Sequence, residues 1–452
     1  MHNYKDDVTT EKLSLLAQIN DPIDPSLYQK YDVKRGLRYD DGHGVLVGLT
    51  RIGDVIGYEV QGDTRVAIPG KLLYRGYNVE DIVRDTVQKG EFGFEQTAYL
   101  LLFGQLPRAE ELTEFNRFLR SRRKLPGHFA EDTILKSPSS DVMNKLARTI
   151  LASYAYDRFP EDVSIKNVMR QCIELIGRLP VMAAYALQAK KHYYDGKSMY
   201  MHNPDPKLST AENFLRLIRP DKSFTRLEAQ ILDLCLILHA EHGGGNNSTF
   251  SVHVISSADT DTYSAMAAAI GSLKGRRHGG ANIQVIQMME DIKKHVYDWK
   301  DEGEVRRYLQ KILHKEAFDK TGLIYGQGHA IYTISDPRAI LLKERAVELA
   351  KTTGYADELE LYKLIERLAP EEIAAIRPLA KKVCTNVDFY SGFIYTMLGI
   401  PQELFTPLFA ISRIAGWSAH RMEEIVAGGR IYRPAFKNVG EERTYIPFAE
   451  RT

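Results

Sequence analysis

Three histidine-containing segments hold the residues of this 452-residue chain that are best suited to chemistry. They are HAEHGGGN at 239–246, GRRHGGAN at 275–282 and GQGHA at 326–330. Histidine changes its charge close to neutral pH, so it serves as an acid, a base or a metal ligand. Glycines beside it let a ligand approach the backbone closely. Each segment therefore has both a structural and a catalytic interpretation.

The first segment ends an apolar helix expected over residues 227–239. His239 and His242 are three residues apart, so they share one helix face near the end that the glycines terminate. Histidines that cap carbonyl groups at the negative helix end are one interpretation. A metal site that includes Glu241 is another, although HAEH lacks the spacing of the HExxH zinc motif.

The second segment places His278 just before the apolar, helical pattern that follows Gly280. The positive end of a helix disfavours imidazolium, so the ring is expected to be neutral and to donate one hydrogen bond. Arg276 and Arg277 push the pKa in the same direction. A histidine that only fills a corner between two helices is the alternative.

Acidic and basic side chains complete the set. Asp388, in NVDFYSG, falls in the first turn of an expected helix, where the carboxylate is stabilised as the anion, although most such aspartates only cap helices. Arg338, in DPR, presents a guanidinium that suits a carboxylate or phosphate, unless DPR is an ordinary loop. Arg413 lies on an apolar helix and Arg433 in a terminal loop.

The composition excludes several classes of protein. The 60 Lys and Arg balance 59 Asp and Glu, which argues against a nucleic-acid surface. Three distant cysteines without a CxxC pair exclude a disulfide framework and a thiolate metal site. No apolar run reaches the roughly 18 residues of a membrane span. The N-terminus shows no export pattern, so we expect a cytoplasmic protein.

The hydrophobic pattern predicts a mainly α fold. Residues 44–60 alternate in hydropathy and are rich in valine and isoleucine, which predicts β structure. From about residue 77 onward the period is helical almost throughout. Pro180 lies inside one long helical stretch and is expected to kink or divide it.

The order of the motifs resembles the citrate synthase family. HGGGN, HGGAN, GQGHA with DPR, NVDFYSG, an SR helix and a C-terminal RP follow one another over residues 242–434, and LLYRGYNVEDI resembles the family's early segment. The resemblance implies a two-domain, all-helical fold with a small β element near the N-terminus. The large domain would comprise residues 1–280 and 392–452, and the small domain residues 281–391.

The resemblance also implies a reaction, the condensation of acetyl-CoA with oxaloacetate and water to citrate and CoA. Asp388 would remove a proton from the acetyl methyl group, while neutral His278 donates a hydrogen bond to the thioester oxygen. His329 would polarise the oxaloacetate carbonyl. A weak carbon acid needs such a base and a donor aimed at the developing oxyanion, so the residue types agree with these roles.

Further residues carry over from the family by position. The substrate-binding positions are His242, Arg338, Arg413 and Arg433, the last reaching in from the second subunit of a homodimer. The CoA-binding positions are Leu323, Gly326, Gln327 and Gly328. The resemblance implies no cofactor and no metal. It therefore argues against a metal site in the HAEH segment.

Three alternatives stay open at this point. A 2-methylcitrate synthase would use propionyl-CoA on the same catalytic residues. A CoA-binding relative without catalysis would have no use for His278, His329 and Asp388. A metal-dependent hydrolase built on HAEH would contain zinc and lose activity with a chelator.

The sequence departs from the common family pattern at Arg276, Arg277, Ile283 and Thr333. We hypothesise that Arg276 or Arg277 supplies positive charge to the CoA phosphates. Replacement of both arginines by alanine is then expected to raise the KM for acetyl-CoA, measured by steady-state kinetics. An unchanged KM would contradict the hypothesis.

Overall fold

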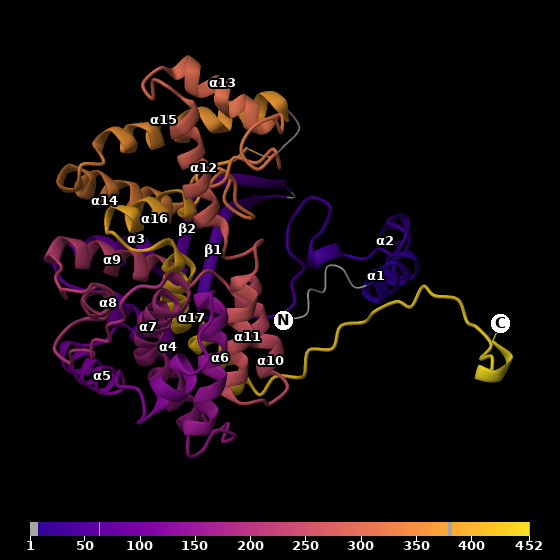
Figure 1. Cartoon of the computed structure of the whole chain (residues 1–452), viewed down its shortest axis with the longest axis horizontal. Helices are drawn as coiled ribbons and strands as arrows, with labels where there is room; N and C mark the ends of the chain where they lie inside the picture. Colours follow the sequence, from indigo (N-terminus) through magenta and orange to yellow (C-terminus); the bar gives the residue numbers. More distant parts are fainter. Residues whose placement is uncertain (1–7, 63, 378–381, 452) are drawn as a thin grey trace. The chain divides into compact units, whose positions relative to one another are not determined.

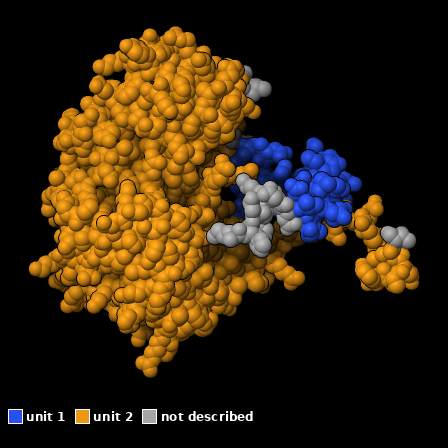
Figure 2. Space-filling model, in the orientation of Figure 1, with its two compact units in different colours: residues 1–49 blue, residues 50–452 orange. Residues whose placement is uncertain are grey.

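The computed structural model describes residues 8–62, 64–377 and 382–451, and it divides the chain into two compact units, residues 1–49 and 50–452 (Figure 2). The first unit contains α1 (Val8–Asn20) and α2 (Ser26–Lys30). Neither helix has a buried residue. The functional residues predicted from the sequence all belong to the second unit.

The second unit begins with a three-stranded antiparallel sheet in the order β1 (Gly53–Gln61), β2 (Thr64–Tyr74), β3 (Tyr77–Asn78). Gly53 pairs with Tyr74, and the register shifts between Ile56 and Tyr58. The predicted β element is confirmed, but it starts later than the sequence pattern indicates. Residues 44–52 lack a neighbouring strand, apart from a single bridge at Gly44, and alternation alone does not make a strand without a partner.

The rest of the second unit is mainly helical (Figure 1). The helices before the GRRHGGAN segment are α3 (Val79–Lys89), α4 (Phe94–Phe103), α5 (Ala109–Ser121), α6 (Val142–Ser153), α7 (Ile165–Asp195), α8 (Thr210–Ile218), α9 (Arg226–His239), α10 (Asn247–Ser256) and α11 (Thr262–Lys274). Those after it are α12 (Ala281–His295), α13 (Glu302–Leu313), α14 (Pro337–Thr353), α15 (Ala356–Ile376), α16 (Val387–Met397) and α17 (Phe405–Ala427). The mainly α prediction is confirmed.

Helix α7 corrects part of one local prediction: Pro180 does not divide the helix, and a kink there stays a prediction. It runs without interruption through Pro180, from its cap at Ser164 to Gly196. Proline inside a helix costs about 3 kcal/mol, because it removes a hydrogen bond and crowds the preceding turn. Almost every residue from Gln171 to Ala189 is buried, so packing on all sides outweighs that cost.

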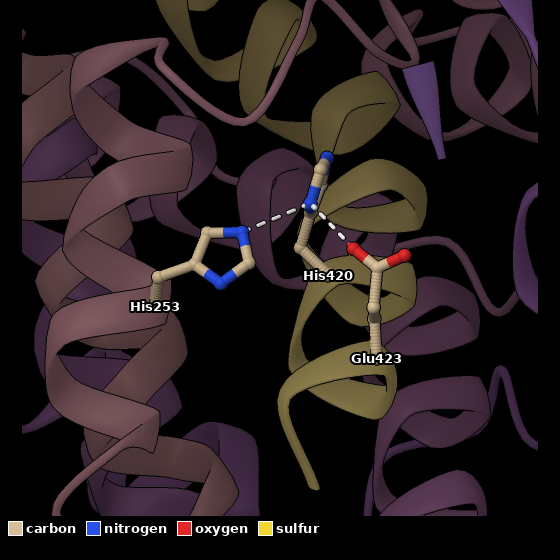
Figure 3. Close-up of side chains that lie close together, drawn as sticks. All are labelled: His253, His420 and Glu423. Atoms are coloured by element: carbon tan, nitrogen blue, oxygen red, sulfur yellow. Dashed lines mark hydrogen bonds and ion pairs between the residues drawn. The ribbon is translucent and has the colours of Figure 1, made fainter. Parts of the chain in front are cut away.

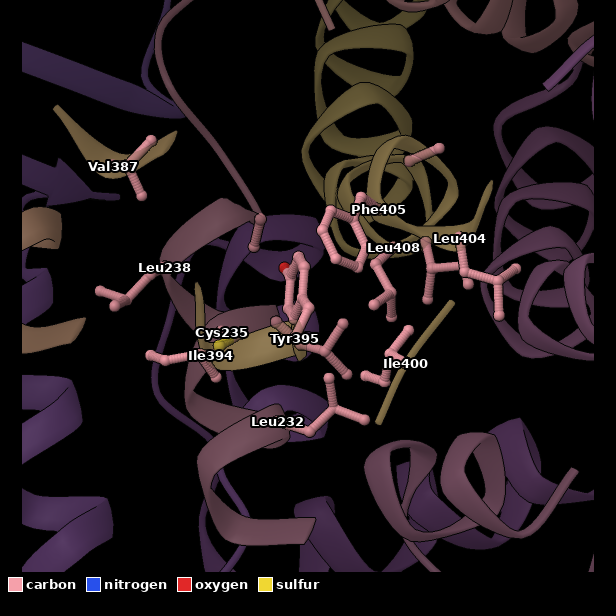
Figure 4. Packing of buried hydrophobic residues seen from close by; sticks show 14 of the residues in the cluster. Leu232, Cys235, Leu238, Val387, Ile394, Tyr395, Ile400, Leu404, Phe405 and Leu408 are labelled. Carbon is pink, nitrogen blue, oxygen red and sulfur yellow. The ribbon is translucent and has the colours of Figure 1, made fainter. Parts of the chain in front are cut away.

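Helix α17 lies at the centre of the core and packs against α4, α7, α9, α10 and α11. Phe405 and Leu408 in its first turn, with Leu404 just before it, lie in an apolar cluster with Leu232 of α9 and Tyr395 of α16 (Figure 4). The apolar packing of α17 also fixes Arg413 and Trp417, which are fully buried. Arg413, a substrate-binding candidate, is thereby held in the buried core.

The division into a large and a small domain stays a prediction. The boundary proposed after residue 280 coincides with the start of α12, whereas the boundary after residue 391 falls inside α16. Among the described residues, no helix is both long and apolar enough to cross a bilayer.

Candidate active site

The two histidines of HAEH have different roles. His239 is the last residue of α9, and its Nδ1 lies 2.6 Å from the carbonyl oxygen of Cys235. Burial lowers the pKa of His239 to about 3, so the ring is neutral. The capping interpretation is confirmed for His239. His242 is also buried, and burial together with Arg338 holds its pKa well below the usual value.

His242 and His329 face each other. Their ring centroids are 5.0 Å apart and the planes are perpendicular. The backbone N–H groups of Ile331 and Tyr332 both donate to Nδ1 of His329 over 3.1 Å. Nδ1 therefore holds a lone pair, and the ring carries its proton on Nε2. His329 therefore presents its Nε2–H as a hydrogen-bond donor beside His242.

His278 lies next to Ser248, whose Oγ is 3.1 Å from Nε2 of the imidazole. The same hydroxyl accepts a hydrogen bond from Nε1 of Trp417 and donates its own proton to Oδ1 of Asn246 over 2.8 Å. With that proton on Asn246, the hydroxyl accepts from His278 and the imidazole carries its proton on Nε2, whereas a hydroxyl turned toward Nε2 would leave the ring proton on Nδ1. Ser248 therefore controls which ring nitrogen of His278 is a donor.

The neutrality predicted for His278 holds, but the cause is different. Burial, followed by the charge of Arg413, lowers the pKa of His278 to about 4. Arg276 and Arg277 are exposed and are not among the groups that shift this pKa. α12 does begin just after His278, as predicted, at Ala281.

Gly279 fixes the turn that carries His278. A Cβ atom at this residue would lie 2.1 Å from the carbonyl oxygen of Leu273, so only glycine fits. The hydroxyl of Thr406 also donates to the carbonyl of Gly279 over 2.9 Å. The paired glycines of the sequence therefore allow the turn to pack between α11 and α17.

Asp388 is the second residue of α16, and the side chain of Asn386 caps the helix. The sequence predicts a stabilised anion at this helix end, and that prediction is wrong. Burial raises the pKa of Asp388 to about 6, with Arg338 and Arg413 opposing the shift and Asp336 adding to it. Desolvation of the carboxylate thus outweighs the helix dipole, and the group becomes a stronger base.

The glycine loop at residues 326–328 pairs with the segment that leads into α16. Gly328 N–H donates to the carbonyl of Cys384 over 2.8 Å, and Asn386 N–H donates to that of Gly326 over 2.9 Å. Gly326 and Gly328 have φ values of 80° and 89°, which side chains with a Cβ rarely adopt. The predicted CoA loop and the predicted base are therefore parts of one local structure.

Asp336 is a residue that sequence reasoning passed over. Its carboxylate accepts two hydrogen bonds from the guanidinium of Arg338, at 3.0 and 2.7 Å, one from the backbone N–H of Arg338 at 3.0 Å, and a fourth from the N–H of Val387 at 3.2 Å. Both charged side chains are buried. Asp336 is the N-cap of α14 and lies two residues before Arg338, and this position in the sequence could have indicated that it pairs with the arginine.

Arg413 has a guanidinium whose outer end is unsatisfied. Its Nε donates to the carbonyl of His239 over 2.6 Å, while Nη1 and Nη2 are buried without a hydrogen-bond partner among the described residues. Burial lowers the pKa of Arg413 to about 10, so it remains a cation. Two buried donors without acceptors indicate a binding site for an anion.

Two predicted residues lie apart from this group. Arg433 is exposed, and among the described residues it forms no hydrogen bond or ion pair with the other predicted site residues. The preceding Tyr432 donates its N–H to Ser257, just beyond α10. Leu323 is exposed on the segment before the glycine loop.

The site combines neutral imidazoles, a carboxylate of raised pKa and two buried guanidinium groups. Arg413 influences the pKa of both His278 and Asp388, which places the three groups in one electrostatic environment. Such a set can hold a substrate with carboxylate groups, remove a proton from carbon and stabilise the oxyanion that forms.

Comparison with known proteins gives the same assignment. The family model for the citrate synthase C-terminal domain matches residues 41–435. The chain belongs to the citrate synthase family. Citrate synthase from Synechocystis is 34% identical over 84% of the chain and 88% of the relative, and 2-methylcitrate synthase from Shewanella oneidensis is 32% identical over 84% and 92%.

Solved structures of citrate synthases have the same fold. The Thermotoga maritima enzyme is 29% identical and aligns with a TM-score of 0.72 over 93% of this chain and 99% of its own. The Thermoplasma acidophilum enzyme, in a ternary complex with carboxymethyl coenzyme A and oxaloacetate, is 27% identical and gives 0.74 over the same shares. The all-helical citrate synthase fold predicted from the motifs is thus confirmed, and the chain belongs to a family of acyl-transferring enzymes.

The Asp336–Arg338 pair generates a stability prediction for this citrate synthase family member. Asp336→Asn leaves the buried guanidinium uncompensated, and we expect the free energy of unfolding to fall by about 3–5 kcal/mol. Equilibrium denaturation with urea measures the change. Asp357→Asn is the matched control, because Asp357 pairs with Lys300 on the surface and both side chains are more than three-quarters exposed. Equal losses in the two variants would contradict the role given to burial.

Proposed function

We propose that the chain is a citrate synthase, which condenses acetyl-CoA with oxaloacetate and water to give citrate and CoA. The observation that carries the proposal is the raised pKa of Asp388 in the same environment as neutral His278 and the buried Arg413. An acetyl methyl group is a very weak acid, so its ionisation needs a desolvated base and a donor for the enolate oxygen.

Oxaloacetate is proposed to bind through its two carboxylates. Arg413 offers two buried N–H groups that have no acceptor among the described residues, and Arg338 adds a second buried cation. His242 adds a ring nitrogen, Nε2, which is likewise buried and without a partner among the described residues. A dicarboxylate would supply acceptors for all of these groups at once. The three groups together therefore restrict the ligand more than any one of them does.

Carbon–carbon bond formation is proposed to start at Asp388. The carboxylate removes a methyl proton from acetyl-CoA, and His278 donates a hydrogen bond to the thioester oxygen as the enolate forms. This role requires the ring proton on Nδ1, and therefore a Ser248 hydroxyl that turns from Asn246 toward Nε2 of His278. Because the ring is neutral, the donor stabilises the oxyanion without giving up its proton completely.

His329 is proposed to act on the second substrate. Its Nε2–H, defined by the two backbone N–H groups on Nδ1, polarises the carbonyl of oxaloacetate and then protonates the new alkoxide. Attack of the enolate carbon gives citryl-CoA. Hydrolysis of the thioester releases citrate and CoA, so water is the third reactant.

The remaining assignments are proposals by family position. CoA would bind along Leu323, Gly326, Gln327 and Gly328, where the rigid glycine loop exposes backbone groups. The active unit would be a homodimer in the cytoplasm, with the partner subunit's Arg433 completing the oxaloacetate site. The reaction itself requires no cofactor.

A 2-methylcitrate synthase is the second candidate, favoured by the similarity to the Shewanella oneidensis enzyme of that name. One methylene group in a pocket is worth about 1–3 kcal/mol, so the two activities differ by degree. The catalytic residues would be the same, and only the acyl pocket would differ.

Release of the CoA thiol tests the function. The purified enzyme receives oxaloacetate with acetyl-CoA or propionyl-CoA, and a thiol reagent follows the rate. We expect faster release with acetyl-CoA, whereas faster release with propionyl-CoA would favour the second candidate. Asp388→Asn is expected to reduce kcat at least 100-fold with oxaloacetate binding largely retained, since general bases contribute about 10²–10⁴-fold. No thiol release with either substrate would contradict both candidates.

The pKa of Asp388 predicts a pH profile. The base acts when deprotonated, so kcat/KM is expected to rise tenfold per pH unit at low pH and to level off above about 6. His278 adds no limb in this range, because its pKa is about 4. Dephospho-acetyl-CoA is the control substrate, since the phosphate monoester of CoA itself titrates near pH 6. A limb near the ordinary aspartate value of 3.8 would disprove the assignment.

A further inference from the structure

A second histidine cluster lies between α10 and α17 and is not used by the proposed reaction (Figure 3). His253 comes from α10, and His420 and Glu423 come from α17. His253 Nε2 is 3.1 Å from His420 Nδ1, and His420 Nδ1 is 3.8 Å from Glu423 Oε2. The three atoms thus point at one small volume, and all lie within 4.8 Å of one another.

The outer nitrogen of each ring faces another carboxylate. His253 Nδ1 is 2.8 Å from Glu424 Oε2, and His420 Nε2 is 3.1 Å from Glu241 Oε1. Histidines that bind metals usually present their second ring nitrogen to a carboxylate in this way, which orients the ring and increases its basicity. His253 has that arrangement as a hydrogen bond, whereas His420 Nε2 lies at ion-pair distance from Glu241 without a hydrogen bond among the described residues.

The protons of a neutral histidine pair cannot satisfy this arrangement. A carboxylate only accepts hydrogen bonds, so His253 Nδ1 carries a proton toward Glu424 and Nε2 holds a lone pair. If His420 Nε2 carries a proton toward Glu241, two lone pairs face each other over 3.1 Å. If His420 instead protonates Nδ1, its Nε2 lone pair faces a carboxylate. A cation between the rings removes the conflict.

The charge of the cluster also favours a cation. Glu241 is buried, yet His420 and Arg413 hold its pKa below the usual value, so it is ionised. Glu423 is anchored by the N–H of Arg51 on Oε1, over 2.7 Å, while its buried Oε2 has no hydrogen-bond partner among the described residues. A buried acceptor without a donor is costly, and a metal ion would satisfy it.

We propose that His253 Nε2, His420 Nδ1 and Glu423 Oε2 form a zinc-binding site. Two imidazoles and one carboxylate are an established ligand set for Zn²⁺, with bonds of about 2.0–2.2 Å and hence ligand atoms about 3.3 Å apart. The separations of 3.1 and 3.8 Å on the two sides of His420 Nδ1 lie near that value, and the third pair of ligand atoms lies within 4.8 Å. Water would take the fourth position, and Glu424 and Glu241 would orient the rings.

The ion would act as a structural link. It would join α10 to α17, and through Glu241 it would steady the segment between His239 and His242. This site is distinct from the HAEH metal site considered from the sequence, since none of its ligands belongs to that motif. It also departs from the expectation that the protein holds no metal, although it gives zinc no part in the reaction.

Zinc content is measured on the untagged full chain after chelation, reconstitution with Zn²⁺ and desalting at pH 7.5. We expect one zinc ion per chain and a higher melting temperature than that of the zinc-free protein. His253→Gln and Glu423→Gln are expected to lose the ion. Glu424→Gln, which changes only an orienting group, is expected to weaken zinc binding about 10–100-fold in competition with a coloured chelator.

His295→Gln is the matched control, because His295 is an exposed histidine on α12 whose ring also lies near a carboxylate, that of Asp291. It is expected to retain the ion, and circular dichroism verifies that each variant is folded. The zinc site would be overturned if the wild-type protein bound no more zinc than His253→Gln. A proton shared between His253 and His420 would then explain their close approach. The site does not depend on the proposed function, so thiol release in the same zinc-free and zinc-loaded samples judges that function separately.

Discussion

The ion pair between Asp336 and Arg338 is the interaction on which the rest of the site depends. Asp336 neutralises a buried guanidinium and at the same time accepts the N–H of Val387, so it joins the start of α14 to the start of α16. Asp388 follows directly in that helix. Without the pair, a buried cation would face the core unpaired, and Asp388 would lose its link to Arg338.

Burial gives the site residues their protonation states. The same desolvation that keeps His278 neutral raises the pKa of Asp388, because both shifts disfavour charge. Arg413 lowers both pKa values, so it limits the shift of Asp388 and adds to that of His278. A donor that stays neutral and a base that ionises near pH 6 result from one low-dielectric environment.

The molecule contains two groups of histidines in opposite electrostatic surroundings. Burial, together with the charges of Arg338 and Arg413, lowers the pKa values of His239 and His242, and these surroundings suit an anion. His253 and His420 are surrounded by Glu241, Glu423 and Glu424, so the space between them suits a cation. The side chains are the same, and the neighbouring charges decide what each cluster binds.

The sequence by itself determined the mainly α class, the turn before α12 and the order of motifs that marks the family, because these depend on local periodicity and on residues close together in the chain. It also indicated His278, His329, Asp388, Arg338 and Arg413 as candidates. Only the tertiary structure decided that Pro180 leaves α7 unbroken, that burial raises the pKa of Asp388, that Asp336 supports Arg338, and that His253 meets His420. Each of these depends on burial or on a contact between residues distant in sequence, and neither quantity is encoded in a local pattern.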